Sequence, residues 1–406
     1  MSVSPDADDL TYNLYEEKSG RLLDPVGPIG LIALSGSLDF TAKVNSHLVK
    51  RRAEAIQAAA RHPAIQSGYL RRDYRILADT QRFSTGEGRA VISQTVRGHD
   101  LFILVDVMNH SCTYDMFGID KPMTPDEHYQ DLKRVILAAS GKARRINVIM
   151  PYLYEGRQHK RNSRESLDCS YMLKELRELG VENLITFDAH DPRVSNAIPL
   201  SGFENIQVAF QMLRSMASSL PDLCENEQGL MVVSPDEGGI TRAMYFASML
   251  GVPLGTFYKR RDYSHVINGR NPIVAHEFLG KTVEGRDILI VDDILSSGET
   301  TLEIAYDLHA KKARRIYVAT SFALFTDGLE GIRKFDRAYQ EGLITRVFST
   351  NLTYRQTALL DAPWYKDVDM TDFVALLIDA INHDASLSPL IEPTGKIREM
   401  LDQIIG

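Results

Sequence analysis

The chain has few cysteines, and they follow no pattern that marks a metal site or a disulfide framework. Its three cysteines, Cys112, Cys169 and Cys224, lie far apart among 406 residues. Widely spaced thiols are typical of proteins from a reducing compartment. We therefore expect free, mostly buried cysteines in a cytoplasmic protein.

Long hydrophobic runs are missing as well. The apolar runs have the length of strands and fall well short of the roughly 20 residues that a membrane helix needs. The first 20 residues, MSVSPDADDLTYNLYEEKSG, are polar and acidic and lack the basic and apolar regions of a signal peptide. We expect no association with a membrane.

The chain also lacks an excess of basic charge. It has 46 Lys and Arg against 54 Asp and Glu, and the formal net charge of −8 argues against nucleic acid as the main partner. A composition of 44% apolar and 25% charged residues is that of a globular protein. Because 406 residues are too many for one ordinary core, two domains are expected.

The two halves of the sequence contain similar segments in the same order. Four pairs match: Gly98–Ser111 with Gly285–Gly298, Lys142–Leu153 with Lys312–Leu324, Glu178–His190 with Gln340–Asn351, and Gly27–Asp39 with Gly229–Gly239. Internal similarity of this kind indicates repeated structural units. We infer two diverged copies of one unit.

Each repeated segment begins with an apolar run of strand length, such as INVIM or LMVVS, and helical spacing follows in segments such as SLDCSYMLKELRELG. Buried strands that alternate with helices predict an α/β fold with parallel sheets covered on both faces. Ligands of such sheets bind beyond the carboxyl ends of the strands. We therefore look for the functional residues there.

The repeats also suggest domain boundaries. We expect an acidic N-terminal extension over residues 1–24 and an N-terminal domain over 25–205, interrupted at about 50–79 by a basic, helical insertion. A C-terminal domain over 206–365 follows, and a helical segment over 366–406 could pack back on the N-terminal domain.

Two adjacent acids, Asp292 and Asp293, follow the apolar run Ile288–Val291. Because neighbouring strand residues point to opposite faces, we expect the backbone to turn at this pair so that both acids reach one ligand. The next residues, Ser296 to Thr301, supply hydroxyls, a glycine and the start of a helix, a combination that favours an anion. A ribose 5-phosphate group would satisfy both features. The alternative is an N-capped helix after a buried strand, with the acids in solvent.

The segment VDDILSSGET resembles the ribose-phosphate-binding loop of phosphoribosyltransferase-type proteins. From about Gly30 onward the chain resembles the ribose-phosphate pyrophosphokinase (phosphoribosyl pyrophosphate synthetase) family, with interruptions at Lys50–Asp79 and around Cys112–Pro125. The resemblance implies two tandem phosphoribosyltransferase-type domains, each a mostly parallel sheet flanked by helices. The internal repeat independently indicates the same duplication.

The resemblance assigns residues to the transferred phosphates and to magnesium. The segment KRRD implies that Lys259 and Arg261 stabilise charge on those phosphates, although three consecutive bases are more often a solvated surface run. His190 and Asp236 would help to hold Mg²⁺, and His190 would also act in catalysis. Asp236 suits Mg²⁺ chemically, because this ion prefers oxygen ligands.

Two further segments resemble parts of the family's ATP site. The segment RFSTGEG would bind adenine through Phe83, Thr85 and Glu87; the alternative is a plain hairpin without this role. The segment GRQHKR would contact ATP through Arg157, Gln158 and His159. In the family, a neighbouring subunit supplies the adenine-binding segment. The resemblance therefore implies a homo-oligomer built from dimers, with a hexamer as the larger form.

The ribose 5-phosphate site implied by the resemblance consists of Asp292, Asp293, Ser296, Ser297, Gly298, Glu299, Thr300 and Thr301. Some positions depart from the family pattern. Thr85, His159 and Ser296 stand where the family typically has Asp, and Glu299 stands where it has Gly. A carboxylate at Glu299 would repel a phosphate unless its side chain points away.

The resemblance implies a cytoplasmic transferase of nucleotide biosynthesis, a ribose-phosphate diphosphokinase. It would transfer pyrophosphate from Mg-ATP to the C1 hydroxyl of ribose 5-phosphate, giving phosphoribosyl pyrophosphate and AMP. The missing acids motivate an alternative, a weakly active or inactive paralogue that binds the same ligands and regulates a partner. A third hypothesis, a phosphoribosyltransferase acting on a base, would need only one copy of the fold.

Overall fold

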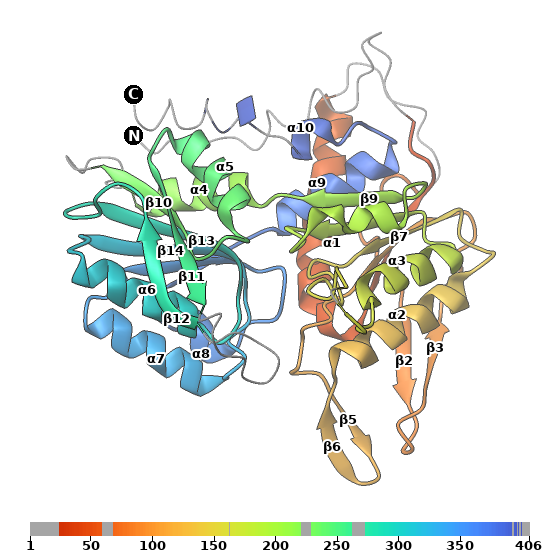
Figure 1. Cartoon of the computed structure of the whole chain (residues 1–406). Coiled ribbons are helices and arrows are strands. Elements are labelled where there is room, and N and C mark those ends of the chain that lie inside the picture. Colours follow the sequence, from red (N-terminus) through yellow and green to blue (C-terminus); the bar gives the residue numbers. More distant parts are fainter. Residues whose placement is uncertain are drawn as a thin grey trace. The chain divides into compact units, whose positions relative to one another are not determined.

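The computed structural model describes residues 24–58, 68–161, 163–220, 229–261 and 273–391, together with residues 394, 395, 397 and 399. Most of the expected N-terminal extension and the end of the C-terminal segment lie outside this description. The described residues form two units (Figure 1). Unit 1 contains those up to Gln207 with Leu352–Tyr354 and the segment from Met370 to residue 391. Unit 2 contains those of Val208–Asn351 and Arg355–Asp369, together with residues 394, 395, 397 and 399.

Unit 1 is built on a five-stranded sheet in which every pairing is parallel. In spatial order its strands are β1 (Ile29–Ala33), β4 (Asp100–Leu104), β7 (Arg145–Ile149), β8 (Asn183–Phe187) and β9 (Gly202–Ile206). Its helices are α1 (Leu38–Ala58), α2 (Pro125–Ala139), α3 (Asp168–Glu178), α9 (Thr371–Asn382) and α10 (Ser388–Ile391), with short 3-10 turns η2 (Ser35–Ser37) and η3 (Pro192–Ala197).

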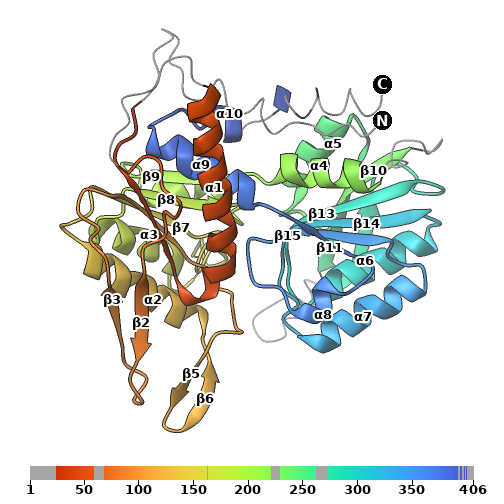
Figure 2. The same ribbon diagram turned by 180° about the vertical axis from the view of Figure 1, so that it is seen from behind.

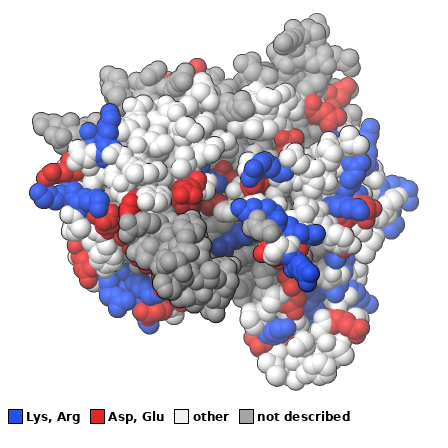
Figure 3. Space-filling view, in the orientation of Figure 1, with Lys and Arg blue, Asp and Glu red and all other residues white. Residues whose placement is uncertain are grey.

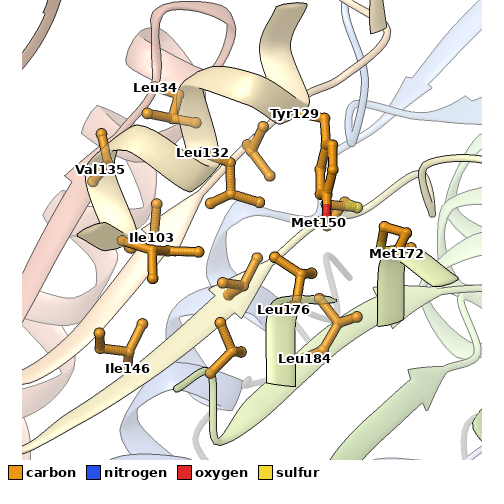
Figure 4. Close-up of a cluster of buried hydrophobic side chains, with 14 of the residues drawn as sticks. Leu34, Ile103, Tyr129, Leu132, Val135, Ile146, Met150, Met172, Leu176 and Leu184 are labelled. Carbon is orange, nitrogen blue, oxygen red and sulfur yellow. The ribbon is translucent and has the colours of Figure 1, made fainter. Parts of the chain in front are cut away.

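Helices cover both faces of this sheet. Leu132 of α2 and Leu176 of α3 meet Ile103 and Ile146 of the strands in one hydrophobic core (Figure 4). Side chains that alternate with these along the strands, such as Phe102, are also fully buried. These alternating side chains point to the other face of the sheet, and the helices α1 and α9 lie side by side over that face (Figure 2).

Unit 2 contains a seven-stranded sheet that is parallel except for one edge strand, β12. Its spatial order is β12 (Ile273–Leu279), β11 (Leu254–Arg261), β10 (Leu230–Ser234), β13 (Asp287–Leu295), β14 (Arg315–Ala323), β15 (Arg346–Thr350) and β16 (Tyr365–Val368). Its helices are α4 (Ala209–Ser219), α5 (Ile240–Leu250), α6 (Glu299–Ala310), α7 (Leu329–Gln340) and α8 (Thr357–Leu360). The single tryptophan, Trp364, is fully buried in its core.

The repeated sequence segments form equivalent strands of the two sheets. The order β1-β4-β7-β8 in unit 1 corresponds to β10-β13-β14-β15 in unit 2, as the sequence pairs require. An ion pair with a fully buried Asp is repeated too, because Asp100 binds Arg145 at 2.7 Å and Asp287 binds Arg315 at 2.8 Å. The prediction of two tandem α/β domains with mostly parallel sheets is thus confirmed.

Two expectations about segment structure need correction. The insertion expected to be helical over about 50–79 is helical only to Ala58, and residues 59–67 lie outside the described chain. Its last part runs along β1 as extended chain, since Leu31 N donates to Tyr74 O at 2.9 Å and Ile76 N donates to Leu31 O at 2.7 Å. The C-terminal segment expected from residue 366 begins inside β16, a strand of unit 2.

Two β-hairpins project from unit 1 in the same direction in both ribbon views (Figures 1 and 2). One pairs β2 (Ala78–Arg82) with β3 (Gly88–Ile92), and the other pairs β5 (Thr113–Met116) with β6 (Ile119–Pro122). In the part of the chain that the structure describes, no helix is long and apolar enough to cross a membrane.

Candidate functional site

The acid pair lies near the carboxyl end of β13 in unit 2. Contrary to our expectation, the backbone does not turn there, because β13 continues in regular parallel register with β14 to Leu295. Asp293 is buried, and its carboxylate lies 3.7 Å from the guanidinium of Arg242 on α5. Burial and the neighbouring Asp293 raise the pKa of Asp292 well above its usual range. Ionising both carboxylates therefore costs free energy, and a bound hydroxyl or cation would reduce this cost.

The turn comes after the acids, at residues 296–298. Gly298 has φ +84°, and a Cβ there would lie 2.4 Å from the ring of Phe335, so both conformation and space require glycine. Helix α6 starts at the next residue, and its first backbone N–H groups open onto this loop. Ser297 Oγ accepts a 3.4 Å hydrogen bond from Glu299 N. The predicted glycine turn before a helix is therefore present.

The hydroxyls of the loop differ in exposure. Ser296 is partly exposed, and its hydroxyl lies 3.4 Å from that of Thr326. Thr300 is also partly exposed, whereas Thr301 is buried in the first turn of α6. Ser296 and Thr300 are thus better placed than Thr301 to reach a ligand with their side chains.

Glu299, which departs from the family pattern, is paired with a cation. Its Oε1 lies 3.1 Å from Nζ of Lys334 on α7, and the same ammonium lies 3.2 Å from Oδ2 of Asp327. The Glu299 side chain is 63% exposed. Its carboxylate therefore points toward α7 and solvent, and the charge at the start of α6 is compensated.

Asp236 follows β10, the neighbour of β13, and so lies at the same edge of the sheet as the acid pair. Its Oδ1 accepts hydrogen bonds from Gly238 N at 3.0 Å and Gly239 N at 3.2 Å. These bonds fix the turn that leads into α5, the helix that carries Arg242. Sequence reasoning missed Arg242; its place in the first turn of a helix at this edge is the signal that could have found it.

Lys259 and Arg261 are the last residues of β11, which pairs in parallel with β10. Their backbone is therefore at the carboxyl edge of the unit 2 sheet, opposite His276 and Ile273 of β12. Their side chains lie outside the described part of the structure.

The predicted adenine-binding residues occupy the turn of the β2–β3 hairpin in unit 1. Phe83 N donates to Glu87 O at 2.8 Å, and the Phe83 ring is 52% exposed. Thr85 Oγ1 donates to Glu87 Oε2 at 3.0 Å, so the threonine found in place of the family's Asp orients this carboxylate. The segment is a hairpin, as the simpler alternative proposed, and the hairpin displays an aromatic ring and a carboxylate.

The second predicted ATP segment follows β7 in unit 1. Gln158 Nε2 donates to Ser166 O at 2.8 Å, and Arg157 is exposed. Four of the eight residues from Arg157 to Arg164 are basic, and basic side chains gather on one part of the surface of unit 1 (Figure 3). This loop suits a polyphosphate.

His159 lies beside the loop that follows β8. Its ring centroid is 5.4 Å from that of His190, and its Nε2 is 3.4 Å from Asp191 Oδ2. Burial lowers the pKa of His159, and hydrogen bonding to Arg193 lowers the pKa of Asp191 to about 2. His190 is exposed. The structure thus brings two predicted residues together and adds Asp191 as a fixed anion.

The described residues contain no group of three or more His, Cys, Asp or Glu side chains placed to hold a metal ion. Mg²⁺ usually keeps several waters and uses one or two carboxylates together with substrate phosphates. One carboxylate at this edge of the sheet, such as that of Asp236, fits that mode of binding. The residues present are therefore compatible with Mg²⁺ bound largely through substrate.

Comparisons with known proteins match both halves of the chain. Residues 31–180 match the family model described as the N-terminal domain of ribose phosphate pyrophosphokinase, and residues 201–351 match the phosphoribosyl transferase domain. The chain is 28% identical to a ribose-phosphate pyrophosphokinase of Mycoplasma pneumoniae, over 76% of this chain and 85% of that protein. It is 29% identical to one of Ralstonia nicotianae, over 65% of this chain and 75% of that protein.

A solved structure has the same fold. The crystal structure of phosphoribosylpyrophosphate synthetase from Mycobacterium smegmatis matches with a TM-score of 0.67 and 18% identity, covering 88% of this chain and 99% of that one.

Proposed function

This chain belongs to the ribose-phosphate pyrophosphokinase family, and from that premise we propose that it is a ribose-phosphate diphosphokinase. The reaction would convert Mg-ATP and ribose 5-phosphate into phosphoribosyl pyrophosphate and AMP. The observation that carries the proposal is the loop of unit 2, where an acid pair precedes a glycine turn and the start of a helix. These are the groups needed for ribose hydroxyls and a 5-phosphate.

The sugar would bind at the carboxyl edge of the unit 2 sheet. Asp292 and Asp293 would accept hydrogen bonds from the ribose hydroxyls, directly or through a metal. The backbone N–H groups of residues 296–301 would hold the 5-phosphate, with help from the exposed hydroxyls of that loop. Arg242, 3.7 Å from Asp293, would pair with that carboxylate and hold it in place.

The reaction is an in-line displacement at the β-phosphorus of ATP. The C1 hydroxyl oxygen forms a bond to this phosphorus, the bond to the oxygen bridging the α- and β-phosphorus breaks, and AMP leaves while the hydroxyl proton passes to solvent. Positioning and electrostatic stabilisation supply most of the rate in such transfers. Bound Mg²⁺ would neutralise phosphate charge; Asp236 is the candidate contact in unit 2 and His190 the candidate contact in unit 1.

Cations of this chain would stabilise the charge that moves between the phosphates. We assign this role to Lys259 and Arg261 of β11, and we assign Arg157 of the basic loop in unit 1 to the phosphates of ATP. Preorganised cations in a water-poor site contribute several kcal/mol to such a step, on the order of 3 kcal/mol for one donor. Gln158 and His159 would contact the nucleotide beside Arg157.

The adenine base would bind at the β2–β3 turn. The exposed ring of Phe83 offers a stacking face, and Glu87, oriented by Thr85, can accept a hydrogen bond from the exocyclic amine. We further propose a homo-oligomer in which this turn serves a second copy of the chain, and a cytoplasmic role in nucleotide biosynthesis.

Phosphorus NMR of the products tests this function. Purified protein with ATP, Mg²⁺ and ribose 5-phosphate should give AMP and a sugar carrying a diphosphate on C1, with coupled phosphorus signals. Omitting either substrate should abolish both products. Formation of ADP with a singly phosphorylated C1 would instead indicate transfer of the γ-phosphoryl group and would refute the assignment.

A further inference from the structure

The β5–β6 hairpin contacts the turn of its neighbour, the β2–β3 hairpin. It falls in the stretch around Cys112–Pro125, where the resemblance to the family is interrupted. The two hairpins lie side by side in both ribbon views (Figures 1 and 2). Phe117 N, at the tip of β5–β6, donates a 2.9 Å hydrogen bond to Ser84 O in the β2–β3 turn.

Packing reinforces this bond. Gly86 of the β2–β3 turn has φ +90°, and a Cβ there would lie 2.9 Å from the sulfur of Met116. The backbone of the turn therefore lies close against β5. Because Ser84 and Gly86 flank Thr85, the two contacts fix both sides of the residue that orients Glu87.

Side chains extend the contact to the core of unit 1. Arg82, the last residue of β2, forms an ion pair with Asp131 of α2 and lies 5.3 Å from the ring centroid of Tyr114 on β5. The Tyr114 hydroxyl donates to Glu127, which forms the capping box of α2 with the N-cap residue Thr124. The first hairpin is thus held between α2 and the second hairpin.

We propose that the β5–β6 hairpin is a positioning element for nucleotide binding, which holds the turn of residues 83–87 in the conformation that receives the base. An isolated two-stranded ribbon is only marginally stable in water, so a projecting turn needs such support to keep Glu87 oriented. This inference rests on the proposed function in one respect, because it assumes that the turn of residues 83–87 binds the nucleotide.

The tip of β5–β6 allows this role to be tested without touching the turn itself. Phe117 and Gly118 have φ of +52° and +77°, the two-residue turn that Asn-Gly prefers. Phe117→Asn therefore keeps the turn and its N–H while removing the ring, which is 74% exposed. Gly118→Val places a β-branched residue at positive φ, with no atom within 4 Å to clash, so it disturbs only the conformation of the tip.

Isothermal titration of the intact protein with Mg-ATP, and separately with ribose 5-phosphate, measures the effect. For Gly118→Val we expect ATP affinity to fall about fivefold, since the apparent Kd rises as the competent population of the turn falls. Ribose 5-phosphate affinity should not change. Phe117→Asn should bind both ligands as the unaltered protein does, and Tyr114→Phe should weaken ATP binding in the same direction as Gly118→Val.

Hydrogen exchange gives a readout that is independent of ligand. In Gly118→Val the amides of Phe83 and Gly86, which are bonded across the turn, should exchange faster. Unchanged ATP affinity in both Gly118→Val and Tyr114→Phe would overturn the inference. Loss of ATP binding in Phe117→Asn would also overturn it, by assigning the effect to the ring. If the protein binds ATP but forms no AMP, the proposed function is refuted, while the comparison of ATP affinities between the variants and the unaltered protein still tests this inference.

Discussion

At the scale of single residues, the acid pair on β13 is where stability and function conflict. Asp292 is partly exposed yet held beside Asp293, and burial together with this neighbour raises its pKa. An ionised carboxylate in this position destabilises the folded chain unless a ligand compensates it. Such conflicts are typical of binding sites.

Asp292→Asn should therefore increase the free energy of unfolding at neutral pH, by about 1 kcal/mol, while abolishing sugar-dependent turnover. Because the pKa of Asp292 is raised in the folded protein, its destabilising effect is present above that folded pKa and disappears as pH falls below the unfolded value. The gain in the free energy of unfolding of Asp292→Asn over the unaltered protein should therefore shrink toward acidic pH. Urea unfolding across pH measures this; a variant that is less stable at every pH would contradict it.

Lys259 provides the sharpest test of a catalytic residue. Lys259→Ala should lower kcat by roughly 10²- to 10³-fold, as for loss of one preorganised charge donor, and should leave ribose 5-phosphate affinity largely intact. Arg260→Ala is the matched control, a neighbouring cation to which the family resemblance assigns no role. Steady-state kinetics and calorimetry separate the two quantities. Equal losses of turnover and sugar affinity in Lys259→Ala would refute its assignment to the transition state.

At the scale of elements, the start of α6 combines the proposed phosphate-binding turn with an acid, Glu299, that departs from the family pattern. Glu299 is tolerated because Lys334 of α7 lies 3.1 Å from its carboxylate. This pair compensates the charge that would otherwise weaken the attraction between the helix N-terminus and an anion.

Lys334→Ala should raise the KM for ribose 5-phosphate by about threefold, the scale of an exposed ion pair, without changing the KM for ATP. The added substitution Glu299→Gly should restore the original value, because it removes the uncompensated carboxylate. Arg333→Ala, which alters a neighbouring pair on the exposed side of α7, is the control. A KM that stays unchanged in Lys334→Ala would show that Glu299 does not affect the phosphate.

The elements also show what the sequence could and could not predict. The repeats predicted the order of equivalent strands, because apolar runs and their connections are local signals. The continuation of β13 past Asp292 was not predictable, since the pairing of Asp292 with Thr320 depends on a distant strand. Arg242 was missed for the same reason: it meets Asp293 only after α5 packs on the sheet.

At the scale of the whole molecule, the chain returns to unit 1 after β16, the last strand of the unit 2 sheet. Helix α9 is part of unit 1, where Asp379 forms a fully buried ion pair with Arg52 of α1 at 2.8 Å. Asn382 of α9 also donates to Asp100, 2.9 Å away. Unit 1 therefore depends on residues that follow the strands of the unit 2 sheet in the sequence.

Asp379→Ala should destabilise unit 1 by about 3–5 kcal/mol, because it leaves a buried guanidinium without its partner. Trp364, the only tryptophan, reports on unit 2 alone. We expect the circular dichroism transition to shift to lower denaturant while the tryptophan fluorescence transition stays in place. Leu360→Ala, at an exposed position, is a control that should move neither. Coincident shifts of both signals would show that the two units unfold together.

We propose above that the duplicated fold makes phosphoribosyl pyrophosphate. The most direct test is the rate of AMP release from the purified protein with Mg-ATP, measured with and without ribose 5-phosphate. We predict release that requires the sugar and exceeds about 1 s⁻¹, the low end for enzymes in general. Absence of sugar-dependent AMP, in protein that still binds both ligands calorimetrically, would contradict the account.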